Sequence, residues 1–255
     1  MRDRVLDELR RIEAQEGVRV LLAVESGSRA WGFASPDSDY DVRFIYAHEP
    51  DWYLSVFENR DVIEEMLPDK LDLSGWDLRK TLRLFSKCNL ALNEWLGSPI
   101  VYCEVRGFRN RFAELIPHYF NPIGALHHYR SMADRILTEH LEDGSIGIKK
   151  LFYVLRPLLA CRWIEQTSAQ PPTEFQQLIT PAWVTADERN WIADLLRQKS
   201  GVMEAQSIRL EETRAASIRS ELDRYQTNAS VSAPVPREGK WAELNTFFRD
   251  LIVMR

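Results

Sequence analysis

The spacing of hydrophobic residues at the start of the chain predicts a helix followed by a strand. Val5, Leu6, Leu9 and Ile12 recur every three to four positions, which is the spacing of an amphipathic helix. Residues 18–24 (VRVLLAV) form a short apolar run rich in β-branched side chains, which indicates a buried strand. The predicted strand runs into the turn sequence ESGS.

The segment that follows, residues 39–47, alternates with a period of two and predicts a second strand. Its apolar face holds Tyr40, Val42, Phe44 and Tyr46. Its opposite face holds Asp39, Asp41 and Arg43. Two carboxylates are therefore expected side by side on one face of this strand.

A further pair of strands is predicted at residues 62–67 (VIEEML) and 71–76 (LDLSGW), joined by the turn sequence PDK. In the second strand Leu71 and Leu73 should point inward and Asp72 to the opposite face. Asp77 then fits the N-cap of a helix.

The character of the sequence changes near residue 105, after which nearly all of the chain is predicted to be helical. Helices are predicted at residues 122–140, 148–165, 203–225 and 241–252. A further helix is predicted to start at the capping box of Thr185 and Glu188, and a loop is predicted at residues 228–236. This division predicts an α/β domain over residues 1–105 and a helical domain over residues 106–255.

Composition narrows the class of protein. With 45% hydrophobic residues in 255, the chain can build a sizeable core. No apolar run approaches the roughly 18 residues of a membrane span, and the three scattered cysteines have no paired spacing. We therefore expect a soluble cytoplasmic protein without a membrane segment. The net charge of −5 argues against coating of nucleic acid through the overall field, but a local basic groove stays open.

Candidate chemistry gathers in residues 25–44. Glycine at position 27 lets the backbone approach a ligand, and N–H groups at Gly27 and Ser28 can cradle a phosphate. Asp39 and Asp41 follow on the next predicted strand, and paired carboxylates are costly unless a cation neutralises them. Oxygen ligands suit Mg²⁺, so the segment predicts metal-assisted phosphoryl or nucleotidyl transfer.

The string GSRAWGFASPDSDYDVRFIY resembles the signature of the DNA polymerase β nucleotidyltransferase superfamily, in which a Gly-Ser turn precedes an Asp-x-Asp strand. It is closer still to a bacterial and phage subfamily of predicted nucleotidyltransferases associated with RNA repair. Similar patches recur between residues 20 and 165, such as LDLSGWDLRK and NEWLGSP. The resemblance implies an α+β fold: an N-terminal nucleotidyltransferase domain with a mixed sheet and flanking helices, then an all-helical C-terminal domain.

The resemblance also implies roles for particular residues. Gly27 and Ser28 would hold nucleotide phosphates, while Asp39 and Asp41 would bind Mg²⁺, or Mn²⁺ in its place. The superfamily adds a third catalytic and metal-binding carboxylate, for which we choose Asp72, with Asp77 as the alternative.

Several basic residues remain open between a functional and a structural role. Arg29 follows the Gly-Ser turn and could reach a phosphate or lie on the surface, and Arg43 could pair with Asp41. Lys149, Tyr153 and Arg156 share one face of a predicted helix, with Lys150 beside it. This stripe could bind a nucleotide or could simply be a solvated face. A second basic stripe, which could track an RNA backbone or simply be solvated, consists of Lys80, Arg83 and Lys87.

The expected activity is that of a metal-dependent nucleotidyltransferase. It would move a nucleoside monophosphate from a nucleoside triphosphate to an acceptor hydroxyl, with release of pyrophosphate and with an RNA end as the favoured acceptor. The alternatives are nucleotidylation of a protein or small molecule, and a non-catalytic nucleotide- or RNA-binding module. The sequence leaves the base of the triphosphate and the oligomeric state open.

Overall fold

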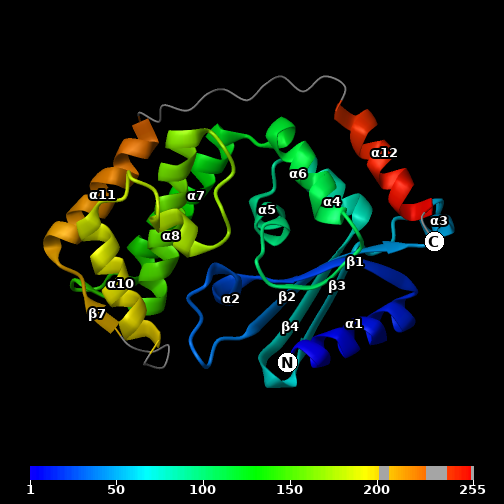
Figure 1. Cartoon of the computed structure of the whole chain (residues 1–255), viewed down its shortest axis with the longest axis horizontal. Coiled ribbons are helices and arrows are strands. Elements are labelled where there is room, and N and C mark those ends of the chain that lie inside the picture. The colour runs from blue at the N-terminus through cyan, green and yellow to red at the C-terminus, as the bar shows by residue number, and fades with distance from the viewer. Residues whose placement is uncertain (201–206, 228–239, 254–255) are drawn as a thin grey trace. The chain divides into compact units, whose positions relative to one another are not determined.

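The computed structural model describes residues 1–200, 207–227 and 240–253, and these residues form two compact units (Figure 1). Unit 1 contains residues 1–30 and 39–119 together with the helix α12 (Lys240–Val253). Unit 2 contains residues 31–38 and the described residues from 120 to 227. The domain division at residue 105 stays a prediction, and α6 (Phe108–Tyr119), which follows that position, belongs to unit 1.

Unit 1 is built on a five-stranded mixed sheet of strand order β3-β4-β2-β1-β5. The strands are β1 (Val18–Glu25), β2 (Tyr40–His48), β3 (Val62–Leu67), β4 (Leu71–Asp77) and β5 (Val101–Glu104). The pairing of β2 with β4 is parallel and the other pairings are antiparallel. The mixed sheet with flanking helices confirms the predicted α+β fold class.

Helices cover both faces of this sheet (Figure 1). On one face, α1 (Arg2–Glu16) buries Val5, Leu9 and Ile12 against the apolar side of β2 and β4, as the alternating pattern predicted. The other face is covered by α4 (Leu78–Ser86), α5 (Leu90–Leu96), α6 and α12. The short elements α2 (Gly27–Trp31), α3 (Pro50–Tyr53) and η1 (Pro68–Lys70) lie in the connections.

Gly75 makes room in the sheet for Phe44, its partner on the neighbouring parallel strand. A Cβ at position 75 would lie 2.1 Å from Cε2 of the buried Phe44 ring. Gly75→Ala is therefore expected to lower the free energy of unfolding by about 1–3 kcal/mol through overpacking. Urea unfolding of this variant, and of the double variant with Phe44→Leu, tests the cause. If the clash is responsible, the double variant should lose less than the sum of the two single losses.

Asp77 is an N-cap, as predicted from the sequence. Its Oδ1 accepts the backbone N–H of Arg79 at 2.8 Å and its Oδ2 accepts the hydroxyl of Tyr53 at 2.7 Å. The side chain is almost fully buried, and this burial raises the pKa of the Asp77 carboxyl, although the hydrogen bonds oppose the shift. Asp77 is thus occupied in starting α4.

The raised pKa of Asp77 gives a pH-dependent stability. The folded state holds the proton at pH values where the unfolded chain has lost it, so stability falls as pH rises from about 4 through the raised pKa. Asp77→Asn keeps an N-cap acceptor but does not titrate. Urea unfolding between about pH 4 and pH 7 should show the wild type losing stability relative to this variant. The same pH dependence of stability in the wild type and in Asp77→Asn would contradict a raised pKa of Asp77.

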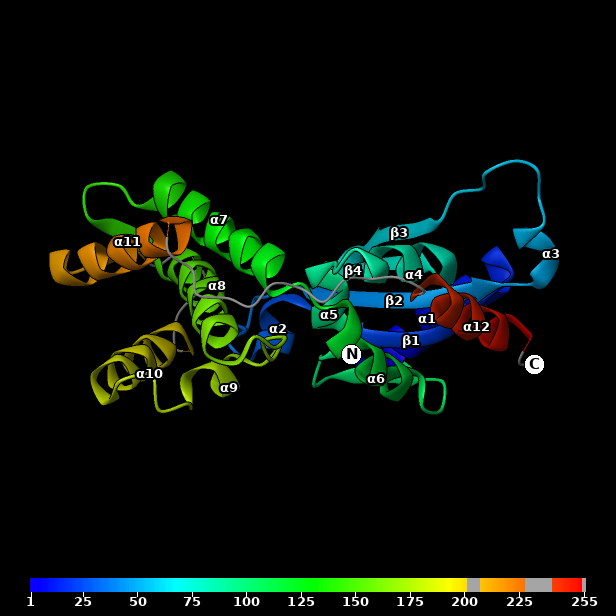
Figure 2. The ribbon, with the colours of Figure 1, turned by 90° about the horizontal axis from the view of Figure 1, so that it is seen from above.

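Unit 2 is mainly helical (Figure 2). Its helices are α7 (Pro122–His140), α8 (Ile148–Thr167), α9 (Phe175–Ile179), α10 (Ala186–Ser200) and α11 (Glu212–Thr227). The Asn121 side chain accepts the N–H of Gly124 at the start of α7, and Thr185 and Glu188 form the reciprocal capping box that the sequence predicted at the start of α10. Helical periodicity and capping therefore predicted α7, α8 and α10, whereas the short α9 was not predicted.

One predicted helix in unit 2 is wrong in its first part. Ser207–Arg209 form the strand β7, which pairs antiparallel with β6 (Ser145–Gly147), and α11 begins only at Glu212. Three-residue strands are too short to show an alternating pattern. Two other predicted segments lie outside the described residues: residues 203–206, where this helix was predicted to begin, and the loop at residues 228–236. No described helix is both long and apolar enough to span a membrane.

Candidate active site

Two carboxylates lie side by side at the beginnings of the parallel strands β2 and β4. Asp41 and Asp72 are direct partners in the parallel register of these strands. Leu71 and Leu73 point into the core under α1, so Asp72 lies on the opposite face of the sheet, as predicted. Strand pairing thus joins residues that are 31 positions apart in the sequence.

Arg43 bridges this carboxylate pair. Its Nη2 atom donates to Asp41 Oδ1 at 3.1 Å and to Asp72 Oδ2 at 2.7 Å, while its Nη1 atom donates to the carbonyls of Val42 and Asp72, each at 3.2 Å. The sequence-based expectation that Arg43 could pair with Asp41 is confirmed. The guanidinium supplies one positive charge against two negative ones.

The turn after β1 brings the backbone against Asp41. Gly27 has a φ of 58°, in the left-handed region that favours glycine, and the N–H of Ser26 donates to the Asp41 carbonyl at 2.8 Å. A Cβ at position 27 would lie 2.2 Å from Asp41 Oδ2. Glycine is therefore needed here for two reasons, its conformation and its lack of a side chain.

The donor chemistry of this cluster fits a hard divalent cation. Asp39 stands immediately before β2, two residues from Asp41, and Asp72 adds a further carboxylate from β4. All the candidate ligands are oxygens, as Mg²⁺ prefers, and Gly27 leaves Asp41 Oδ2 uncrowded by a Cβ. Within the described ranges, no three Asp, Glu, His or Cys side chains are already gathered as a metal site. A cation bound by all three aspartates thus requires side-chain movement.

A buried glutamate is hydrogen-bonded to the backbone of Asp41. Glu25, at the end of β1, accepts the backbone N–H of Asp41 at 2.8 Å and the hydroxyl of Tyr102. Burial raises the pKa of Glu25, and these two hydrogen bonds oppose the shift. Ser98 also donates to the Glu25 carbonyl, at 2.6 Å. This network fixes the start of β2, from which Asp41 projects.

Ser28 and Arg29, the other candidate phosphate-binding residues in the turn, both contact the protein itself. Ser28 is buried. Arg29 donates from Nε to the carbonyl of Asp39 at 2.9 Å, and its guanidinium lies 3.7 Å from the centre of the Tyr40 ring. Arg29 therefore links the turn to the residues that lead into β2, and its contact with a phosphate stays a prediction.

The predicted nucleotide-binding stripe lies on α8 in unit 2. Arg156 is only 3% exposed, and its guanidinium lies over the Trp31 ring and donates to the carbonyl of Thr173 at 3.2 Å. Tyr153 packs edge-on against Trp31, with ring centres 5.1 Å apart. Lys149 is half-buried and Lys150 exposed. Helical spacing alone could not reveal that Trp31 covers part of this stripe, and its role toward a nucleotide stays a prediction.

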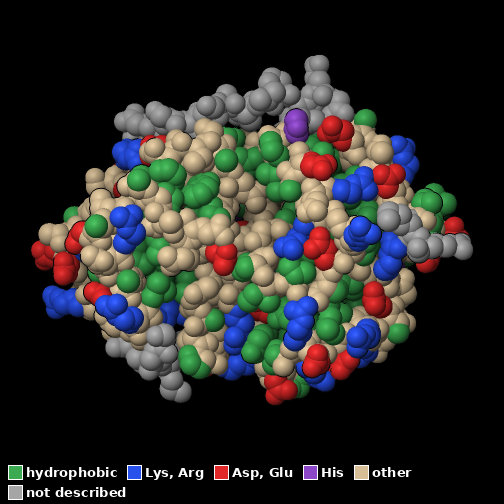
Figure 3. All heavy atoms as spheres, in the orientation of Figure 1, with side chains coloured by type: hydrophobic (Ala, Val, Ile, Leu, Met, Phe, Trp, Pro, Cys, Tyr) green, Lys and Arg blue, Asp and Glu red, His purple; other side chains and the backbone are tan. Residues whose placement is uncertain are grey.

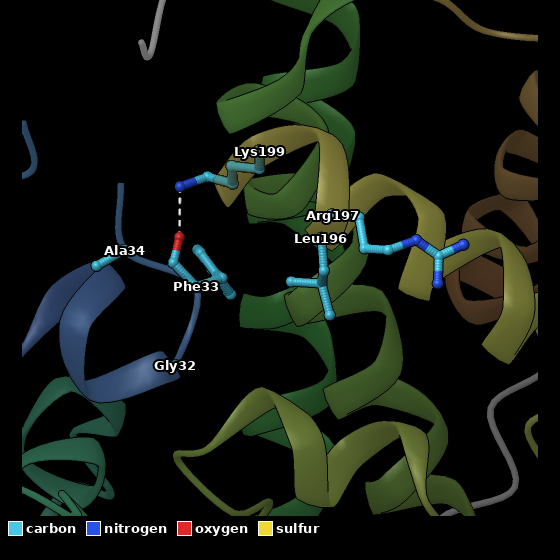
Figure 4. A pocket seen from close by; sticks show the side chains of 6 residues that line it. All are labelled: Gly32, Phe33, Ala34, Leu196, Arg197 and Lys199. Atoms are coloured by element: carbon cyan, nitrogen blue, oxygen red, sulfur yellow. Dashed lines mark hydrogen bonds between the residues drawn. The ribbon is translucent and has the colours of Figure 1, made fainter. Parts of the chain in front are cut away.

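A pocket of about 300 Å³ in unit 2 is lined by two basic side chains, Arg197 and Lys199 (Figure 4). Lys199 is buried there and donates to the carbonyl of Phe33, while Arg197 is paired with Asp194. The pocket has no acidic side chain among its lining residues, which are Gly32, Phe33, Ala34, Leu196, Arg197 and Lys199. It lacks the carboxylates found beside Gly27, so we do not place the chemistry there.

A family model described as "RNA repair pathway DNA polymerase beta family" matches residues 1–250. The chain belongs to this family. A Bacillus subtilis (strain 168) protein with the name "Uncharacterized protein YcgL" is 49% identical over 199 residues, which cover 78% of this chain and 76% of that protein. The crystal structure of a nucleotidyltransferase-like protein from Exiguobacterium sibiricum 255-15 aligns over 96% of this chain and 79% of its own, at 11% identity and a TM-score of 0.31.

Membership of the RNA repair pathway DNA polymerase β family confirms the resemblance seen in the sequence. It identifies the chain as a polymerase-β-type nucleotidyltransferase and agrees with the mixed sheet of unit 1. Two residues of the site, Glu25 and Tyr102, were not predicted from the sequence. The position of Glu25 as a charged residue at the end of an apolar strand could have indicated its role. Nothing in the sequence indicates the role of Tyr102, because β5 is far from β1 along the chain.

Proposed function

We propose that the protein transfers a nucleoside monophosphate from a nucleoside triphosphate to an acceptor hydroxyl and releases pyrophosphate. The observation that carries this proposal is the in-register pair of Asp41 and Asp72 beside the Gly27 turn. Family membership supports the same chemistry. Asp39, Asp41 and Asp72 would hold Mg²⁺, or Mn²⁺ in its place, since a donor set of carboxylates suits either ion.

Such a cation, when bound, activates a hydroxyl and stabilises charge on phosphoryl oxygens. In our assignment Gly27 and Ser28 hold the phosphates through backbone N–H groups, and Asp72 accepts the proton of the acceptor hydroxyl. The acceptor oxygen then bonds to the α-phosphorus. The bond from that phosphorus to the bridging oxygen breaks, pyrophosphate leaves with the bonding electrons, and Asp72 passes its proton to solvent.

The choice of Asp72 over Asp77 for the proton-accepting role rests on position. Asp72 is the register partner of Asp41, whereas Asp77 is the partner of Tyr46, five residues further along β4, and caps α4. Asp72 also shares Arg43 with Asp41. Asp72 is therefore the carboxylate that can act at the same centre.

An RNA end is our favoured acceptor, because the family description places its members in an RNA repair pathway. Nucleotidylation of a protein or small molecule is a second candidate, favoured by the net charge of −5. Lys/Arg and Asp/Glu side chains are interspersed over the described residues on the face shown in Figure 3. Within the predicted basic stripe, Lys80 is paired with Asp61 at 2.9 Å. We assign the protein to the cytoplasm as part of this proposal.

The acceptor and the base can be tested together. The protein is incubated with α-labelled ATP, CTP, GTP or UTP, Mg²⁺, and a mixture of cellular RNA and protein, beside the Asp39→Ala/Asp41→Ala variant. Label that enters RNA only with the wild type supports RNA as acceptor and identifies the preferred base. Label on protein supports the second candidate. Triphosphate binding without transfer, unaffected by Mg²⁺, would instead indicate a non-catalytic module.

A further inference from the structure

Arg43 occupies an unusual position for a basic residue beside a proposed metal site. One nitrogen, Nη2, is hydrogen-bonded to both Asp41 Oδ1 and Asp72 Oδ2. The other terminal nitrogen, Nη1, is held by the carbonyls of Val42 and Asp72. The guanidinium is therefore fixed by backbone groups and does not depend on the carboxylates alone.

The charges explain why such a residue is useful. Asp41 and Asp72 project from neighbouring strands, and two adjacent carboxylates repel each other strongly when neither is neutralised. The side chains are 31% and 27% exposed, so water screens this repulsion only in part. Arg43, at 18% exposure, supplies a permanent positive charge between them.

We propose that Arg43 is an internal counter-ion that keeps the carboxylate pair together and competes with the divalent cation for it. The inference rests on the proposed function, because it takes Asp41 and Asp72 as ligands of that cation. A cation bound at Asp41 Oδ1 and Asp72 Oδ2 would lie next to the Arg43 guanidinium, which donates to the same two oxygens, so its binding has to overcome the repulsion of that positive charge. Arg43 is thus a positioning residue that preserves the site without metal and weakens metal binding.

Metal affinity is the direct test, measured without nucleotide by titration with Mn²⁺ and detection of free Mn²⁺ by electron paramagnetic resonance. Arg43→Gln should bind Mn²⁺ at least about tenfold more tightly than the wild type, because the positive charge beside the carboxylate pair is removed. Arg43→Lys should lie between the two, since an ammonium cannot make the same set of hydrogen bonds. Arg60→Gln, which removes an equal charge from an exposed pair with Glu64, should match the wild type.

Thermal unfolding gives a second readout. Metal-free Arg43→Gln should melt below the wild type, and Mn²⁺ should raise its melting temperature by more than that of the wild type. Unchanged or weaker Mn²⁺ binding by folded Arg43→Gln overturns the inference. If that variant does not fold, Arg43→Lys decides: binding no tighter than the wild type overturns it. Mn²⁺ binding that is unaffected by Asp41→Asn would instead refute the proposed metal site itself.

Discussion

Asp41→Asn is expected to lower kcat/KM for nucleotidyl transfer by at least about 10³-fold, because the divalent cation that we propose Asp41 holds would supply several kcal/mol of transition-state stabilisation. Asparagine has nearly the same shape and can still accept the hydrogen bond from Arg43. The backbone bonds of Asp41 to Glu25 and Ser26 are also kept. The loss would therefore come from the carboxylate charge and not from the fold.

Steady-state assays with α-labelled triphosphate measure this effect, and urea unfolding verifies that the variant is folded. Asp7→Asn is the matched control, since it removes the same charge from an exposed pair with Arg10 on α1 and should leave activity unchanged. Retention of activity within about threefold in Asp41→Asn would remove Asp41 from the catalytic centre.

Gly27→Ala is expected to reduce kcat/KM by about 10²-fold or more, since displacement of catalytic groups by about 1 Å has that effect. The new Cβ would lie 2.2 Å from Asp41 Oδ2, so either the turn or the carboxylate must shift. The effect should appear mainly in kcat if the carboxylate shifts. It should appear also in KM if the turn moves away from the phosphates.

Gly17→Ala separates this clash from backbone strain. Gly17 has a φ of 62°, close to the 58° of Gly27, but nothing lies within 4 Å of a Cβ placed there. Both variants should lose similar stability through the left-handed backbone, whereas only Gly27→Ala should lose activity. Equal loss of activity in the two variants would mean that the close approach to Asp41 is irrelevant.

The sequence predicted those parts of unit 1 that depend on local periodicity. Alternation in residues 39–47 placed Val42 and Phe44 in the core and Asp41 and Arg43 on the other face, because a strand has a period of two. Alternation cannot, however, reveal which strands are neighbours. The second partner of Arg43 is Asp72, and it follows only from the parallel pairing of β2 with β4.

Long-range packing accounts for the other features that the sequence did not reveal. The helix of residues 241–252 was predicted, but not that Leu244, Phe247 and Leu251 of α12 complete the core of unit 1. Arg156 read as part of a polar stripe because its spacing is helical. Its burial against Trp31 depends on a segment more than 100 positions earlier in the chain.

In the proposed reaction, the carboxylates beside Gly27 support transfer of the nucleotide and release of pyrophosphate. Parallel reactions with α-labelled and γ-labelled triphosphate, Mg²⁺ and cellular RNA distinguish this reaction from transfer of the γ-phosphate, with Asp41→Asn beside the wild type. We expect the α-label to move to the acceptor and the γ-label to appear as pyrophosphate, both only with the wild type. Transfer of the γ-label to an acceptor, or equal transfer of the α-label by Asp41→Asn, would contradict it.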